Sequence, residues 1–250
     1  MDLLLCNDDG IDASGIAALE EALAPLGTVW VVAPESEQSA ASHALTMHKP
    51  LRAHRHAERH WAISGTPADC IYLGLNHLLP GRPDVVVSGI NRGSNLGNDV
   101  FYSGTVAAAM EAALHGLPAT AVSLHLEPGD RERHWATAGG VARRVVEGLR
   151  DHPLADGVFL NVNVPNCAAD AVRGLRATAL GRRRYAPRVD LRTDPRGRHY
   201  YWIGGSHQAF VPLEGTDGPA IEAGWATVTP LRPDLTAQTA LDALRAWSDA

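Results

Sequence analysis

The chain has 250 residues, of which 45% are hydrophobic and 20% are charged, and its formal net charge is -6. This length suits one α/β domain with an appendage that buries a core without disulfides, and the composition indicates neither a disordered nor a fibrous protein. The negative charge argues against non-specific nucleic-acid binding, which requires a basic face, so no nucleic-acid partner is expected.

Over the first 165 residues, short apolar runs alternate with segments that carry apolar residues at helical spacing. The apolar runs predict strands at 2–6, 28–34, 83–91, 119–125 and 157–165, and the periodic segments predict helices at 13–25, 103–116 and 134–152. Strands that are apolar throughout and separated by helices are typical of a parallel sheet covered on both faces. We therefore expect a three-layer, Rossmann-like α/β core with a mostly parallel sheet. The histidine-rich stretch 54–60 predicts an exposed loop.

The pattern changes after about residue 170. Residues 182–209 surround the turn signal TDPRGR and predict a β-hairpin, and a strand at 225–231 and a helix at 236–249 are predicted to follow. We divide the chain into an α/β core over 1–170, which carries the metal and phosphate site, and a C-terminal extension over 171–250. The hairpin and the terminal helix are too small to bury their own apolar surface, so we expect them to contact another subunit.

Three cysteines, Cys6, Cys70 and Cys167, fit neither a disulfide framework nor a CxxC metal site. This favours a reducing compartment. The first residues, MDLLLCNDDG, show no signal peptide, and no segment approaches the roughly 20 consecutive apolar residues of a membrane helix. The sequence predicts a cytoplasmic protein without a membrane partner.

An acidic pair, Asp8 and Asp9, directly follows the strand predicted at 2–6. In open parallel sheets, ligands bind at the carboxyl ends of the strands. Adjacent carboxylates at the end of a buried strand repel each other unless a cation compensates their charge. A bound divalent metal is one interpretation. The other is that Asp9 caps the following helix while Asp8 is solvated.

Two further strand ends carry neutral oxygen donors. Ser39 lies in the loop after the strand at 28–34, and Asn91 ends the strand at 83–91. Mg²⁺ and Mn²⁺ prefer carboxylate and neutral oxygen ligands, so both residues are candidates to complete a metal site. Ser39 also fits an ordinary turn or cap residue, whereas Asn91 directly follows an apolar strand.

The helix predicted at 103–116 begins with Ser103, Gly104 and Thr105. A helix N-terminus presents unpaired N–H groups and a positive dipole end, which together bind phosphate. Asn95, in the glycine-flanked segment NRGSNLGND, lies in the loop before it. The alternative is an ordinary Ser or Thr N-cap.

Several other catalytic signatures are absent from the sequence. It contains no GxGxxG dinucleotide fingerprint, no GxxxxGK[ST] phosphate loop and no GxSxG nucleophile elbow. The histidines between 43 and 60 form no HExxH arrangement. The acidic pair and the helix start therefore remain the features that carry chemistry.

Several long segments carry a family resemblance. They are LLLCNDDGIDASGI, VVAPESEQSAASHALT, SGTPADC, VVVSGINRGSNLGNDVFYSGTVAAAMEAALHG, NVNVP and, near the C-terminus, GTDGPAIEAGWATVTPLRPDLT. In content and order they resemble the SurE family, the survival-protein nucleotidases. The resemblance spans almost the whole chain.

This resemblance implies a metal-dependent phosphatase that hydrolyses nucleoside 5′- and 3′-monophosphates, with some activity on short polyphosphate. The metal ligands that it implies, for one divalent Mg²⁺ or Mn²⁺ ion, are Asp8, Asp9, Ser39 and Asn91. The phosphate-binding residues that it implies are Asn95, Ser103, Gly104 and Thr105. It further implies a homodimer or homotetramer, formed partly by exchange of the C-terminal segment. One departure is visible, because many members have glycine directly after the serine of the QS pair, where this chain has Ala40.

The chemistry expected is metal-assisted hydrolysis, in which Asp8 and Asp9 are catalytic through a metal-activated water. An alternative uses one of these aspartates as the nucleophile, although the DxD spacing typical of that route is missing. Two other classes are a nucleotide-sensing module without turnover and a metal-dependent amide hydrolase. The first gains nothing from two carboxylates near an anion, and the second normally adds histidine ligands.

Overall fold

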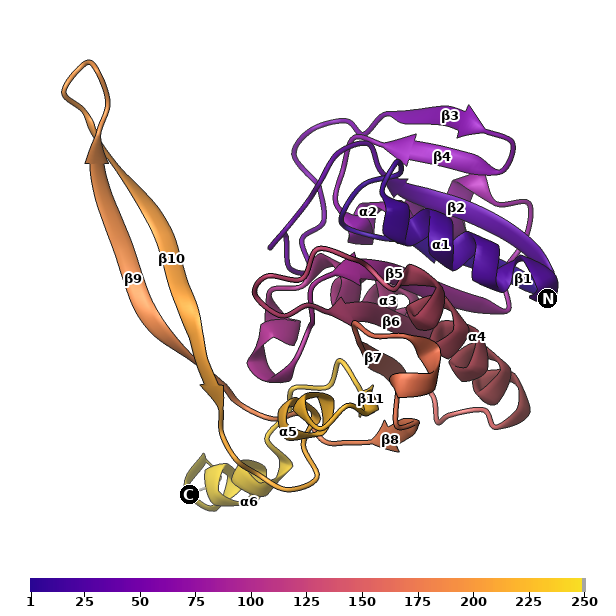
Figure 1. Cartoon of the computed structure of the whole chain (residues 1–250). Coiled ribbons are helices and arrows are strands. Elements are labelled where there is room, and N and C mark those ends of the chain that lie inside the picture. The colour runs from indigo at the N-terminus through magenta and orange to yellow at the C-terminus, as the bar shows by residue number, and fades with distance from the viewer. Residues whose placement is uncertain (249–250) are drawn as a thin grey trace.

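A nine-stranded sheet with the order β3-β4-β2-β1-β5-β6-β7-β11-β8 forms the centre of the molecule (Figure 1). The computed structural model describes residues 1–248, except for the side chains of residues 205–208 and 247. The six strands from β4 to β7 in this order are parallel to their neighbours, whereas β3 and β11 are antiparallel to β4 and β7. The expected mostly parallel α/β core is confirmed.

The strands of this sheet are β1 (Asp2–Cys6), β2 (Thr28–Pro34), β3 (Ala53–Ala57), β4 (His60–Ile63), β5 (Val85–Arg92), β6 (Ala119–His125), β7 (Phe159–Pro165), β8 (Leu175–Ala177) and β11 (Ala226–Leu231). The helices are α1 (Ser14–Leu23), α2 (Pro67–Leu73), α3 (Gly104–Leu114), α4 (Trp135–Asp151), α5 (Asp217–Glu222) and α6 (Gln238–Ser248). Two further strands, β9 (Arg183–Thr193) and β10 (His199–Phe210), form a separate two-stranded sheet.

Helices cover both faces of the central sheet, because the parallel strands are apolar on both sides. Residues of α1 and α4, such as Leu19 and Val146, pack with one set of strand side chains. Residues of α2 and α3, such as Ile71 and Val106, pack with the opposite set. The result is the three-layer arrangement predicted from the uninterrupted apolar runs.

The sheet reverses its direction of growth between β1 and β5. From β1 the chain adds β2 and β4 on one side, then returns to place β5, β6 and β7 on the other side. Such a reversal leaves a crevice at the carboxyl ends of the two central strands, because the connections depart in opposite directions. Asp8 and Asp9 follow β1 and Asn91 lies at the end of β5, so the topology brings them to this crevice.

The histidine-rich stretch at 54–60 is a correction to the sequence interpretation. It forms the antiparallel hairpin β3–β4 at the edge of the sheet rather than an unstructured loop. All five residues of β3 are exposed, so this edge strand lacks the apolar alternation that identifies a half-buried strand. The helix α2 was also missed, although Thr66 and Asp69 form a capping box at its start.

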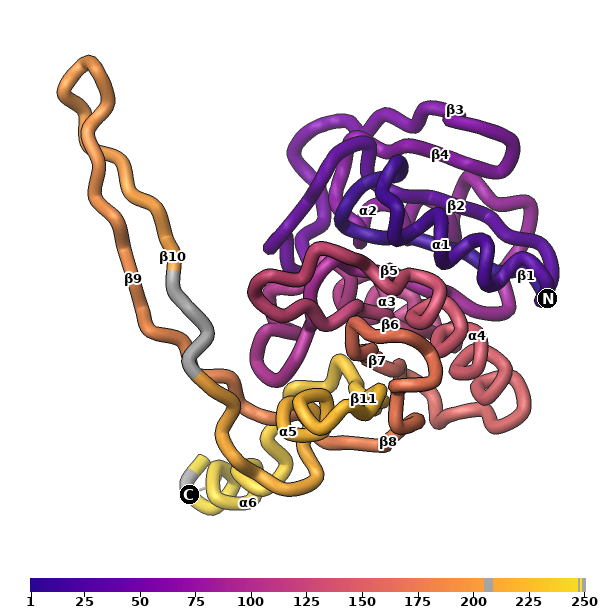
Figure 2. Tube along the Cα trace, in the orientation of Figure 1, coloured from indigo at the N-terminus to yellow at the C-terminus, as the bar shows by residue number. Residues whose placement is uncertain are grey.

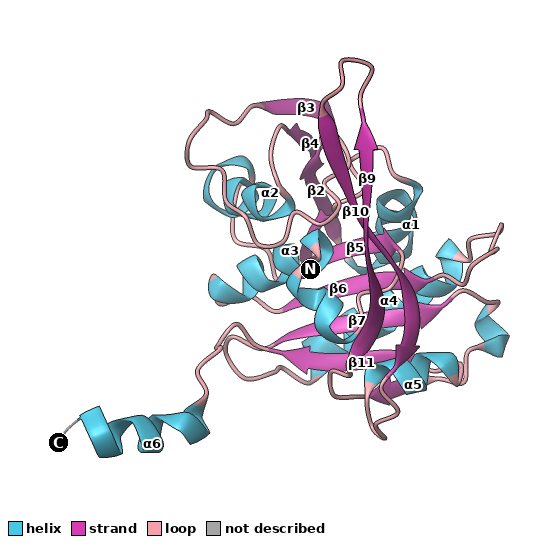
Figure 3. Cartoon of the chain, turned by 90° about the vertical axis from the view of Figure 1, so that its left-hand side faces the viewer, coloured by secondary structure: helices cyan, strands magenta, loops and turns pink. Residues whose placement is uncertain are grey.

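The C-terminal third both completes the sheet and projects from it. The strands β8 and β11 extend the central sheet beside β7, whereas the hairpin β9–β10 stands away from the core (Figure 1). The trace in Figure 2 and the turned view in Figure 3 show α6 beyond the core as well. The predicted hairpin is confirmed, and the terminal helix is described to residue 248, with residue 249 of its predicted span outside the described residues.

Within the described part of the chain, no helix combines the length and the apolar character that crossing a bilayer requires.

Candidate metal and phosphate site

The acidic pair lies on a braced turn after β1. The Asn7 side chain donates to the Gly10 carbonyl at 2.7 Å and accepts from the Gly10 amide at 3.2 Å. Gly10 has a φ of +101°, a backbone conformation that other residues rarely adopt. This closed turn fixes the backbone between Asn7 and Gly10, so Asp8 and Asp9 lie at the carboxyl end of the central strand β1.

Asp8 is buried and is held by the start of α3. Its two carboxylate oxygens accept from the Thr105 hydroxyl at 2.6 Å and from the Thr105 amide at 3.1 Å. Burial raises the pKa of Asp8 to about 6, and the charge of Asp9 adds to this rise, whereas the Thr105 hydrogen bonds oppose it. A neighbouring cation would stabilise the ionised form of this carboxylate, which burial and the charge of Asp9 disfavour.

Asp9 faces the opposite side of the same crevice, towards the end of β5. Its carboxylate accepts from the Arg92 amide at 3.1 Å. Burial raises the pKa of Asp9, which the hydrogen bond and charge of Arg92 counteract and the charge of Glu37 reinforces. Among the described residues, neither aspartate forms a salt bridge with a basic side chain, so the charge of the pair is compensated only in part.

A cavity of about 340 Å³ opens between these strand ends. All four residues expected to hold the metal line it, together with two of those expected to bind phosphate. The complete lining is Asp8, Asp9, Glu37, Ser39, Ala40, Asn91, Arg92, Ser94, Asn95, Asp99, Tyr102 and Ser103. The structure therefore brings together residues that lie up to 95 positions apart in the chain.

The donor set of this cavity fits a hard divalent cation. Four of its lining side chains are carboxylates and one is an arginine, so the lining is net negative. An anionic phosphate would be repelled from such a surface unless a cation bridged them. Within the described residues, no cluster of three or more His, Cys, Asp or Glu side chains is arranged as a metal site. Ser39 and Asn91 would therefore have to complete the coordination with neutral oxygens.

The side chains of Ser39 and Asn91 also have hydrogen-bond partners nearby in the protein. The Ser39 hydroxyl donates to Glu37 at 2.6 Å, and the Asn91 amide donates to the Gly93 carbonyl at 2.7 Å. The first contact draws Glu37 to the cavity beside Ser39. The second contact uses the side-chain nitrogen of Asn91, so this bond does not occupy the side-chain oxygen that would bind a metal.

The loop that carries Ser39 is fastened to α3 and to the turn before it. Ser42 donates its hydroxyl to the Phe101 carbonyl at 2.7 Å, and His43 contacts the buried Glu111 at 2.7 Å. Ala40 has a φ of +57°, which is a left-handed conformation. It stands at the position where the family resemblance leads us to expect glycine. The departure in sequence thus leaves a glycine-like backbone in place.

The residues at the start of α3 that are predicted to bind phosphate make contacts within the protein. Ser103 caps the helix by accepting from the Val106 amide at 3.1 Å, which is its ordinary N-cap role. Thr105 is fully buried and directs both of its donors at Asp8, so its hydroxyl does not face the cavity. The reason is that the Asp8 carboxylate occupies the position of an anion at this helix N-terminus.

Gly104 also contacts Asp8. A Cβ atom at this position would lie 2.9 Å from the Asp8 Cβ and 3.0 Å from its Oδ2. The missing side chain of Gly104 therefore allows α3 to approach the acidic turn closely. Gly104 does not line the cavity.

Asn95 is held on several sides by buried polar side chains. Its amide donates to Asn163 at 2.8 Å, its carbonyl accepts from Asn161 at 2.8 Å, and its side-chain nitrogen donates to Ser123 at 2.8 Å. These partners belong to β6 and β7, so the strands of the sheet position the loop. Asn161 and Asn163 belong to the NVNVP segment, and two polar residues inside an apolar strand are a signal from which this role could have been predicted.

Sequence reasoning did not select six of the lining residues, namely Glu37, Ala40, Arg92, Ser94, Asp99 and Tyr102. All of them except Asp99 lie within two positions of a selected residue, as Arg92 does after Asn91. The cavity lining contains no histidine, which argues against an amide hydrolase with histidine ligands.

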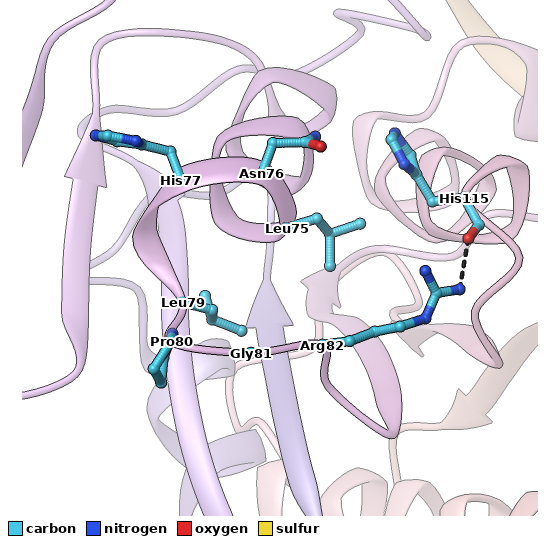
Figure 4. A pocket seen from close by; sticks show the side chains of 8 residues that line it. All are labelled: Leu75, Asn76, His77, Leu79, Pro80, Gly81, Arg82 and His115. Carbon is cyan, nitrogen blue, oxygen red and sulfur yellow. Dashed lines mark hydrogen bonds between the residues drawn. The ribbon is translucent and has the colours of Figure 1, made fainter.

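A second cavity of about 370 Å³ lies near the other end of α3 (Figure 4). It is lined by residues 75–77, 79–82 and His115, and it contains no carboxylate. Arg82 donates to the carbonyls of His115 and Gly116 at 2.6 and 2.9 Å, so its charge is directed at the C-terminus of the helix. We assign the chemistry to the cavity at the strand ends.

The chain is similar to known proteins over almost its whole length. Residues 3–187 match the family model described as "Survival protein SurE". Proteins named 5′-nucleotidase SurE are 48% identical in Pelobacter propionicus and 47% identical in Geobacter sulfurreducens, each over 99% of this chain and over 99% and 94% of the relative. The crystal structure of the SurE protein from Aquifex aeolicus matches with a TM-score of 0.87 and 38% identity, covering 100% of both chains.

Proposed function

The chain belongs to the SurE family, and from this premise we propose that it is a 5′-nucleotidase that hydrolyses nucleoside 5′-monophosphates with the help of a divalent cation. The observation that carries the metal dependence is the net negative cavity at the sheet crevice, where Asp8 and Asp9 lie beside the neutral donors Ser39 and Asn91. A site for an anionic substrate with this lining needs a cation.

The residues have distinct roles in this proposal. Asp8 and Asp9 would hold one Mg²⁺ or Mn²⁺ ion with Ser39 and Asn91, and a bound cation of this kind polarises a phosphoryl oxygen and acidifies a water. Asn95 and Ser103, which both line the cavity, would orient the phosphate and stabilise its growing negative charge. Arg92, which lines the same cavity, adds a cationic side chain for the substrate.

Direct attack by water is favoured over an aspartyl-phosphate intermediate. Both oxygens of Asp8 accept hydrogen bonds from Thr105, and an oxygen of Asp9 accepts from Arg92. A nucleophilic carboxylate has to present a free oxygen lone pair to phosphorus. These contacts instead suit carboxylates that are fixed in place for a metal.

We extend the proposal to nucleoside 3′-monophosphates and short polyphosphate, because both present the same terminal phosphoryl group to the cavity. A nucleotide-sensing module without turnover is the second candidate. The acidic pair disfavours it, since a buried and a partly buried carboxylate with raised pKa values cost stability and serve an anion only through a metal.

One assay tests the function. We expect the purified protein to release phosphate from nucleoside 5′-monophosphates, and more slowly from 3′-monophosphates and tripolyphosphate, in the presence of Mg²⁺ or Mn²⁺. Excess EDTA should abolish the release, and added Mn²⁺ should restore it. A protein that binds the nucleotides with metal but releases no phosphate would be a sensor, and activity that persists in EDTA would exclude the metal mechanism.

We also propose that the protein forms a homodimer or homotetramer through its C-terminal extension. The hairpin β9–β10 is a two-stranded sheet whose apolar side chains are not covered by a second layer. Its exposed large hydrophobic side chains are Tyr185, Val189, Leu191, Tyr200, Tyr201, Trp202 and Ile203, and Ile203 is 91% exposed. An apolar surface of this kind on a projecting element marks a contact with another chain.

Light scattering coupled to size-exclusion chromatography tests the assembly. We expect the wild-type protein to be oligomeric at micromolar concentration, and Ile203→Asp or truncation after residue 232 to weaken the association, because each removes apolar contact surface. Leu114→Asp is the matched control, since Leu114 is 57% exposed on α3, away from the extension. A monomeric wild-type protein would contradict the proposal, as would variants that associate like the wild type.

A further inference from the structure

The base of the projecting hairpin is attached to the loop that carries Asn95. We call residues 95–99 the phosphate loop, because Asn95 and Asp99 line the cavity. The first residue of β9, Arg183, donates its backbone amide to the Asn98 side chain at 2.8 Å. Residues from the C-terminal extension thus contact the site directly, although the hairpin itself projects away from the core (Figure 1).

Asp217, at the start of α5, joins three segments through one buried carboxylate. Its Oδ2 accepts from the Gly97 amide at 2.8 Å, and its Oδ1 accepts from the amides of Gly181 and Gly218 at 2.8 Å each. The residue is 0% exposed. A fully buried carboxylate is retained at low cost only when its lone pairs are used, and three amide donors meet that condition.

The same junction depends on the close approach of two glycines. Gly97 has a φ of +55°, and a Cβ atom there would lie 2.9 Å from the Gly181 carbonyl oxygen. A Cβ atom at Gly181 would lie 2.8 Å from the Asp217 carboxylate. The phosphate loop, the chain entering the hairpin and the start of α5 are therefore in backbone contact, without room for side chains between them.

A charged contact lies beside this junction. Asp99 pairs with the Arg183 guanidinium at 2.6 Å and accepts from the Tyr185 hydroxyl at 2.5 Å. Both members of the ion pair are mostly buried, with side-chain exposures of 16% and 18%. Burial and the contact with Asp99 raise the pKa of Tyr185, so its hydroxyl stays protonated and donates. The Arg183 guanidinium therefore offsets the negative charge of Asp99 at the wall of the cavity where the phosphate would bind.

We propose that the base of the hairpin positions the phosphate loop, with Asp217 fixing its backbone through Gly97 and Arg183 neutralising Asp99 at the cavity wall. Asp217 and Arg183 are positioning residues, because they act through Gly97 and Asp99 rather than on the substrate. This inference rests on the proposed nucleotidase function. It makes the C-terminal extension a part of the active site as well as a surface for assembly.

The variant Asp217→Asn tests the backbone contact selectively. With its oxygen placed for Gly181 and Gly218, the asparagine turns its NH₂ group towards the Gly97 amide, so two donors face each other. We expect hydrogen exchange in the peptide that contains Gly97 to accelerate by about tenfold or more. We expect kcat/KM for a nucleoside 5′-monophosphate to fall by about tenfold or more, while Mn²⁺ affinity stays within about twofold, because the metal residues lie on other segments.

Thr229→Val is the matched control. Thr229 is buried in β11 of the same extension, and its hydroxyl forms a 2.8 Å hydrogen bond with that of Thr178, which is not part of the phosphate loop. We expect this variant to lose thermal stability to a similar degree but to keep wild-type kinetics and wild-type exchange at Gly97. Equal kinetic losses in both variants would show a general effect of destabilisation and would overturn the proposal.

A second pair of variants tests the inference even if Asp217→Asn does not fold. Arg183→Gln leaves Asp99 with an uncompensated charge facing the phosphate, so we expect KM to rise by about tenfold with a smaller change in kcat. Adding Asp99→Asn to this variant should restore KM, because it removes that charge. A double variant with KM no better than that of Arg183→Gln would contradict the role assigned to Arg183.

The measurements separate this inference from the proposed function. If the wild-type protein hydrolyses no nucleotide, the function fails, but exchange at Gly97 still reports whether Asp217 holds the loop. If the wild type is active and Asp217→Asn changes neither exchange nor kcat/KM, the positioning role fails and the function stands.

Discussion

Asp8→Asn and Asp9→Asn are each expected to lower the turnover of a nucleoside 5′-monophosphate by about 100-fold or more, because a carboxylate that holds the cation is lost. The fold should persist. In Asp8→Asn the side-chain oxygen can accept from the Thr105 amide while the NH₂ group donates to the Thr105 hydroxyl, replacing both present contacts. Mn²⁺ affinity, measured by calorimetry, should fall with the turnover.

The metal-free Asp8→Asn protein is also expected to be more stable than the metal-free wild type above about pH 6. The pKa of Asp8 is raised from 3.8 to about 6, so the folded state binds this proton more tightly than the unfolded state. Stability is therefore lost as pH rises through this window, and the full cost at higher pH is on the order of 3 kcal/mol. Asparagine carries no such charge. Thermal denaturation in EDTA at pH 5 and pH 8 measures the difference.

The control for these variants is Asp12→Asn, because Asp12 lies near the same turn with a side chain that is 81% exposed. It should keep wild-type turnover and metal affinity. Wild-type activity of Asp8→Asn or Asp9→Asn in excess EDTA would refute the metal hypothesis, and a loss of activity with unchanged Mn²⁺ affinity would assign these aspartates another role.

Gly104→Ala is expected to cause the second large loss, of about 100-fold in kcat/KM, since displacements near 1 Å in an active site have effects of this size. The new methyl group would overlap the Asp8 Cβ at 2.9 Å and would also approach the Pro67 Cγ at 3.1 Å. Asp8 or the start of α3 has to move, so metal affinity and turnover should fall together. Gly104→Val should be more severe, because its side chain is larger.

Gly140→Ala provides the comparison, because it places the same methyl group on the exposed surface of α4, where no atom lies within 4 Å. There the change should raise stability slightly, as alanine favours helix over glycine. The interpretation of Gly104 would be wrong if Gly104→Ala bound Mn²⁺ and turned over nucleotide like Gly140→Ala.

The sequence predicted those site residues that are polar and lie directly at the end of an apolar strand. Asp8, Asp9 and Asn91 were selected because they end apolar strands, and the structure places all three at one cavity. The partners of these residues could not be selected in the same way. Thr105 looked like a phosphate ligand from its helix start, but it contacts a carboxylate 97 residues earlier in the chain.

The sequence by itself determined the layered α/β core, because uninterrupted apolar strands can be buried only between two layers of helices. It also determined the hairpin, whose turn signal is local. The edge hairpin β3–β4 was decided by tertiary structure, since an exposed strand carries no periodic apolar signal. The attachment of Asp217 to Gly97 joins residues 120 positions apart. Such a contact depends on how β8, β9 and α5 pack beside the core, and that packing is set by long-range burial that no local pattern records.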